Sequence, residues 1–208
     1  EKIDAEYKNK SSFLNPVNAS GLAKEIQEDI KSSDNILNEY LDHVNFFVDP
    51  TISQIYTYYI YSSLVDLRRN GKKFSVDQFK KILSSIVKIS QEVKENDGSY
   101  EFKNKSFDLG NWYWVLNSIS SLIESTMYDL NDDDYKDFRQ DLITVISYLL
   151  KIEGSPDKDS EDHICDPTTG NDPHGEAINS VRGKAYTAFI ALCCKDGKLL
   201  MDDTKKVF

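Results

Sequence analysis

The stretch SVDQFKKILSSIVKISQEV, residues 75–93, decides the fold class of this chain. Its apolar residues recur every three or four positions, which places them on one side of an α-helix. Ser75 and Gln78 have the spacing of a capping box, in which each side chain accepts a hydrogen bond from the other residue's backbone N–H. The stretch predicts a long amphipathic helix with one apolar stripe: Val76, Phe79, Ile82, Leu83, Ile86, Ile89 and Val93.

The same periodicity recurs on both sides of this stretch. Upstream, Asp49 suits an N-cap, Pro50 suits the first helical position, and Gly71 can take the left-handed conformation that ends a helix. Further helices are predicted within 20–31, 34–44, 109–130, 131–154 and 172–194, with a short last one from about residue 199. No stretch favours a pair of strands.

About seven helices joined by mostly short connections predict an all-α fold of antiparallel helix pairs. Stacked pairs would form an irregular, HEAT-like α-solenoid, and a closed helical bundle is the alternative. We expect residues 1–208 to form a single all-α domain, with an irregular segment at 1–15 and a long polar loop at 155–171. Because the chain starts at Glu1 and a new amphipathic segment begins shortly before Phe208, we expect it to be a fragment of a larger protein.

Composition narrows the class of partner. Of the 208 residues, 39% are hydrophobic and 12% aromatic, which is enough apolar surface for a packed core. The net charge of −10 repels phosphate backbones and anionic lipids, so nucleic acid and membranes are poor candidates. Three cysteines, Cys165, Cys193 and Cys194, do not make a disulfide framework and are typical of a cytoplasmic protein.

A weak basic patch is the exception to this acidic character. Its members are Arg68, Arg69, Lys72 and Lys73, beside two further lysines. The simpler interpretation is the solvated end of a helix and the loop that follows it.

Metal-capable side chains gather between residues 161 and 176. His163, Cys165 and His174 could each bind zinc, but a structural zinc site needs four ligands and no fourth is evident. The sequence also has no phosphate-binding Gly-Lys-Ser/Thr loop and no nucleophile elbow. We therefore expect no metal, no cofactor and no catalytic residue.

The stretch 171–194 carries unusual residues for a buried helix. Asp172 suits its N-cap, and Asn179 and Arg182 lie three apart on one flank, beside Gly183. A guanidinium with five donors suits the carbonyls of a loop or of a helix end. We expect these four residues to form a structural clamp, with acceptors in the 155–171 loop or at the end of the preceding helix. A ligand-binding Arg182 or an exposed one are the alternatives.

Residues 172–192, DPHGEAINSVRGKAYTAFIAL, resemble a segment of the helical-repeat, HEAT-like regions of large bacterial multidomain NTPases, several of them linked to antiphage defence. The Asn-Ser-Val-Arg-Gly motif at 179–183 carries the resemblance. It implies a non-catalytic scaffold or protein-recognition module whose partners are other domains of the same polypeptide or another protein. The alternative function is a metal- or nucleotide-dependent enzyme fragment that uses residues 163–182.

Overall fold

The structure is a computed structural model, and it describes residues 19–48, 54–95, 112–152 and 180–195. Within these ranges the chain is all-α, as predicted, and contains no strand. The described helices are α2 (Ala19–Ser32), α3 (Asp34–Asp42), α4 (Val44–Phe47), α5 (Gln54–Arg69), α6 (Val76–Glu95), α7 (Trp112–Met127), α8 (Asp132–Leu149) and α11 (Val181–Lys195).

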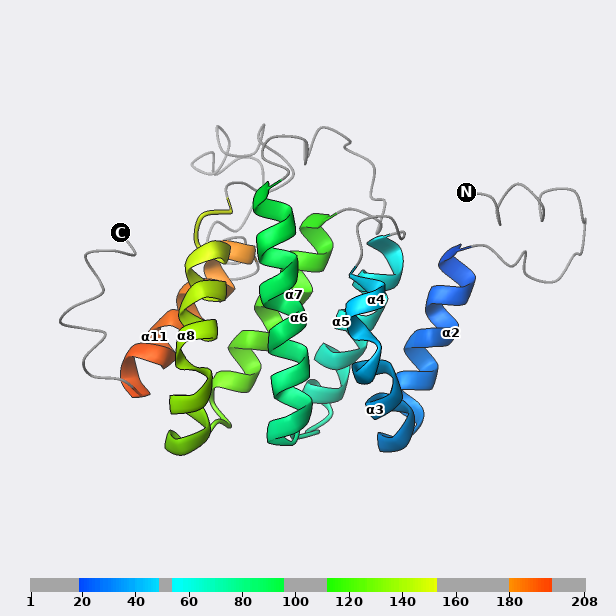
Figure 1. Cartoon of the computed structure of the whole chain (residues 1–208), viewed down its shortest axis with the longest axis horizontal. Coiled ribbons are helices and arrows are strands. Elements are labelled where there is room, and N and C mark those ends of the chain that lie inside the picture. Colours follow the sequence, from blue (N-terminus) through cyan, green and yellow to red (C-terminus); the bar gives the residue numbers. More distant parts are fainter. Residues whose placement is uncertain (1–18, 49–53, 96–111, 153–179, 196–208) are drawn as a thin grey trace, which may run out of the picture.

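The helices form two rows. In one row α2 packs on α5, α5 on α7, and α7 on α11; in the other, α3 and α4 pack on α6, and α6 packs on α8. Figure 1 shows the chain advancing from α2 at one end to α11 at the other, with successive long helices running in opposite directions. The arrangement therefore consists of antiparallel helices in two layers, and the choice between an irregular solenoid and a closed bundle stays a prediction.

Local signals in the sequence fix several helix ends. The capping box before α6 is confirmed, because Ser75 Oγ accepts from Gln78 N at 3.2 Å and Gln78 Oε1 accepts from Ser75 N at 2.9 Å. Gly71 has a φ of +86°, and its N–H donates to the Arg68 carbonyl at 2.9 Å. A left-handed residue there ends α5 sharply and turns the chain back toward α6.

Helix α7 is the centre of the core. It packs between α5 and α11, and none of its residues is fully exposed. Across the two rows, the Tyr61 hydroxyl on α5 lies 2.6 Å from Ser85 Oγ on α6, and both residues are buried. This hydrogen bond satisfies two polar groups that would otherwise destabilise the core.

Two helix boundaries differ from prediction. The helix expected to continue to residue 44 ends at Asp42, and the short α4 follows after a turn at His43. The helix expected within 172–194 is not continuous, because Ser180 is not helical and its Oγ accepts from Gly183 N at 3.0 Å, so that α11 begins at Val181; the expected start at Asp172 lies outside the described residues. Ser180 is therefore the residue that caps this helix.

Several predicted segments lie outside the described residues: the irregular segment 1–15, the start of α5 at Asp49 and Pro50, the loop 155–171 and the last short helix. Among the helices that the structure does describe, none has both the length and the apolar character needed to cross a bilayer.

Candidate functional site

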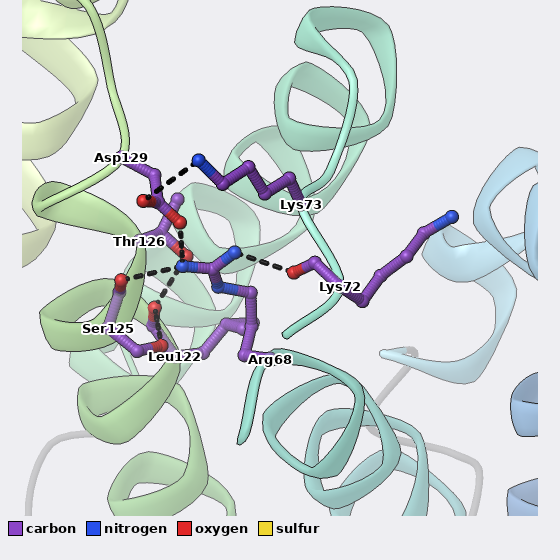
Figure 2. Close-up of polar contacts among 7 residues, drawn as sticks. All are labelled: Arg68, Lys72, Lys73, Leu122, Ser125, Thr126 and Asp129. Atoms are coloured by element: carbon purple, nitrogen blue, oxygen red, sulfur yellow. Dashed lines mark hydrogen bonds and ion pairs between the residues drawn. The ribbon is translucent and has the colours of Figure 1, made fainter. Parts of the chain in front are cut away.

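A polar cluster centred on Arg68 joins the ends of α5 and α7 (Figure 2). Arg68 Nη1 donates to the Lys72 carbonyl at 2.6 Å, and Nη2 donates to the Ser125 carbonyl at 2.9 Å. Nη2 also forms an ion pair with Asp129 Oδ2. The side chain is only 8% exposed, so this guanidinium fastens the α5–α6 turn to the C-terminal end of α7.

The charge of Asp129 depends on this contact. The hydrogen bond from Arg68 is the largest cause of a pKa below the usual range for this carboxyl, and the charges of Arg68 and Lys73 act in the same direction. Lys73 Nζ lies 3.7 Å from the other carboxylate oxygen. Asp129 is thus held ionised as a structural anion, the opposite of what a proton-donating catalytic acid needs.

Beside this cluster the surface has a small hollow of about 100 Å³. Water occupies about 30 Å³ per molecule in the liquid, so the hollow has room for a few waters rather than an organic substrate. Its walls are partly apolar and partly charged: Arg68, Lys73, Phe74, Ser75, Val76, Phe79, Thr126, Asp129, Leu130 and Asp134.

The structure distributes the predicted basic patch among separate ion pairs. Arg68 is buried against Asp129, and Lys72 pairs with Asp34 of α3. Arg69 is exposed next to the buried Arg68, and Lys73 is exposed beside Asp129. Three of the four cations therefore form ion pairs, Arg68 and Lys73 with Asp129 and Lys72 with Asp34, which offsets most of the charge that a phosphate backbone would require.

Of the four predicted clamp residues, Arg182 and Gly183 lie within the described part of the chain, while Asp172 and Asn179 lie outside it. Arg182 Nε donates to the Leu150 carbonyl, which caps the end of α8, at 3.1 Å. This acceptor is the end of the preceding helix, one of the two expected positions. The Arg182 side chain is otherwise exposed, so the contact is a surface tie and not a buried clamp.

Two lysines that the sequence did not single out also hold α11 in place. Lys184 Nζ donates to Asn117 Oδ1 of α7 at 2.6 Å, and Lys195 Nζ donates to the Leu130 carbonyl before α8 at 2.5 Å. Burial lowers the pKa of Lys184, and the charge of Glu124 opposes that shift. Burial raises the pKa of Glu124, because it disfavours the charged form of the carboxyl as it does that of the lysine. Neither lysine stands at a recognisable motif, which is why only coordinates identify these contacts.

The predicted zinc ligands His163, Cys165 and His174 lie outside the described residues. Within the described ranges, no group of three or more His, Cys, Asp or Glu side chains could hold a metal ion. The metal alternative for the region 163–182 therefore stays a prediction.

The surface carries a few large apolar side chains. Phe46 on α4 is 65% exposed, and Ile190 on α11 is 61% exposed. On α11 the exposed positions are Arg182, Tyr186, Ile190 and Cys194, which recur every four residues and form one stripe along the helix.

No protein-family model, no curated protein and no solved structure matches this chain. The resemblance of residues 172–192 to HEAT-like regions thus remains a prediction.

Proposed function

We propose that this chain is a non-catalytic helical scaffold that recognises other protein parts, within a larger cytoplasmic protein. The observation that carries the proposal is how its charged side chains are used. Arg68 ties α5 to α7, Lys81 pairs with Asp42 between α6 and α3, and Lys31 pairs with Asp66 between α2 and α5. Among the described residues these pairs join one element to another, and the hollow that Arg68 and Asp129 help to line has a volume of only about 100 Å³, too small for an organic substrate.

A scaffold also needs surfaces that partners can contact. Exposed large apolar side chains mark such surfaces when they lie together on one element. The stripe on α11 has this form, whereas Phe46 stands on the short α4. The resemblance of residues 172–192 supports the narrower proposal that the parent is a large bacterial NTPase, of the kind linked to antiphage defence.

Site-specific photo-crosslinking in the native cell tests the proposal. A photoreactive residue is placed in turn at Phe46, Tyr128 and Ile190, which are exposed on α4, after α7 and on α11. We expect a discrete protein adduct from at least one position, lost when an aspartate is placed next to it. The absence of adducts from all three positions would contradict the proposal.

The rival enzyme function is tested on the same protein. If residues 163–182 hold a metal, elemental analysis will find a stoichiometric ion, and a chelator will lower the melting temperature. We expect neither, and we expect no shift in melting temperature with magnesium and ATP. Binding of a ligand at a hundred times its Kd stabilises by about 2.7 kcal/mol, so a real site would be readily detected.

A further inference from the structure

The exposed stripe on α11 has an apolar centre. Tyr186 is 38% exposed and Ile190 is 61% exposed, with Arg182 one turn before them and Cys194 one turn after. On the opposite side, Val181, Ala185, Ala188, Phe189 and Leu192 are buried against α7 and α8. Helix α11 is therefore apolar on two sides, which is typical of a helix that is packed on both.

The helix at the other end of the row differs. The exposed residues of α2 are mostly charged, with Lys24, Glu25, Glu28 and Asp29 beside Leu22. A polar outward face is what a terminal helix of a stack requires for solubility. Among the described helices, α2 thus presents a charged outward face, whereas α11 presents a face suited to a further helix.

Charge specifies the chemistry of that further helix. Helix α11 has no acidic residue, although the chain as a whole has a net charge of −10. Its Lys184 and Lys195 bond to Asn117 and to the Leu130 carbonyl, so Arg182 is the cation of α11 that lies in the stripe. Lys151 is exposed and follows Leu150, whose carbonyl accepts the Arg182 hydrogen bond. The apolar stripe is thus bordered by cations at its N-terminal end.

We infer that the stripe Arg182–Tyr186–Ile190–Cys194 docks an acidic amphipathic helix of a protein partner. The inference rests on the proposed scaffold function and deepens it. The partner's apolar residues pack on Tyr186 and Ile190, and its carboxylates face Arg182 and Lys151. A second copy of α11 fits less well, because α11 has no acidic residue that could face Arg182 and Lys151.

Alkylation of Cys194 provides a direct assay. Cys194 is exposed within the stripe, whereas the neighbouring Cys193 is buried. In a Cys165→Ser background, these two are the remaining cysteines of the chain. The probe is a helical peptide of about five turns, with leucines on one face and glutamates on both flanks; the matched control peptide has lysine in place of every glutamate.

We expect the glutamate peptide to slow iodoacetamide modification of Cys194 in a saturable manner, and the lysine peptide to bind at least about tenfold more weakly. Ile190→Asp should weaken binding of the glutamate peptide at least about tenfold, because the substitution places a charge in the apolar contact. Phe46→Asp, an equally exposed apolar site on another helix, should leave binding unchanged.

Four results would overturn the inference. The first is equal protection of Cys194 by both peptides, and the second is protection by neither. The third is a Cys194 that reacts as slowly as Cys193 before any peptide is added and becomes reactive on truncation after Lys195, which would show that the chain covers its own stripe. The fourth is a dimer that Ile190→Asp dissociates. Adducts at Phe46 or Tyr128 in the crosslinking experiment would leave the scaffold function intact in each of these cases.

Discussion

Replacing Arg68 with alanine should destabilise the protein far more than the same change at the adjacent Arg69. The two arginines stand side by side at the end of α5, yet Arg68 is 8% exposed and Arg69 is on the surface. Alanine at 68 removes two hydrogen bonds to carbonyls and the ion pair to Asp129. The comparison therefore measures how much one buried guanidinium contributes to folding stability, with an exposed arginine next to it as the control.

The size of the effect follows from the partners left behind. A hydrogen bond from a charged donor contributes about 1.5–3 kcal/mol, and breaking a buried ion pair costs about 3–5 kcal/mol. Asp129 is 32% exposed, so water replaces part of what Arg68 supplied. We expect the free energy of unfolding to fall by about 3 kcal/mol for Arg68→Ala and to change by no more than about 0.5 kcal/mol for Arg69→Ala.

Urea denaturation of both variants, followed by circular dichroism at 222 nm, measures these free energies. For a chain of this size, about 3 kcal/mol corresponds to a fall in Tm of roughly 6–12 °C. Equal losses for Arg68→Ala and Arg69→Ala, or a loss below about 0.5 kcal/mol at position 68, would refute the view that this residue fastens α5 to α7.

Three further predictions concern single contacts. The pKa of Asp129 is lowered in the folded state, so the ionised carboxylate stabilises the fold above the unfolded pKa of about 4, and this stabilisation is lost as pH falls through the folded pKa. The difference in unfolding free energy between wild type and Arg68→Ala should therefore become smaller in acid titrations below about pH 4. Gly71→Ala should cost about 1 kcal/mol through its φ of +86° alone, since a Cβ there would meet nothing within 4 Å, and an unchanged denaturation midpoint would contradict this. Arg182→Ala should cost about 1 kcal/mol, because a single hydrogen bond to Leu150 at an exposed side chain is lost; a cost above about 3 kcal/mol in the same assay would indicate a buried clamp instead.

Periodicity and caps predict most of the described helices because both are properties of neighbouring residues. Ser75, Gln78 and Gly71 act locally, and the structure confirms them. The prediction of one continuous helix over 172–194 was wrong at Ser180, because nothing nearby in the sequence shows that its hydroxyl caps a helix that begins at Val181. The turn at His43 has no glycine or proline to mark it.

The hydrogen bonds and ion pairs between helices depend on which face of each helix packs against which neighbour. The sequence predicts these faces only in part. Arg68 follows the buried Tyr61 and Leu64 on one row of α5, but Arg69 follows Tyr61 and Val65, which are buried too. Helical phase alone therefore does not distinguish the two arginines. The acceptors of Arg68 and Lys195 are backbone carbonyls, which every residue possesses, so no side-chain pattern could have identified them.

The nearest-neighbour packing of the two rows has a consequence for how such a chain can change during evolution. Helix α2 makes its main contacts with α3 and α5, and α11 makes its own with α7 and α8. A duplication or deletion at either end of the described rows would therefore alter the contacts with the adjacent helices and leave the packing between the other described helices unchanged. Evolution can in this way change the length of the helix rows without changing how the core is packed.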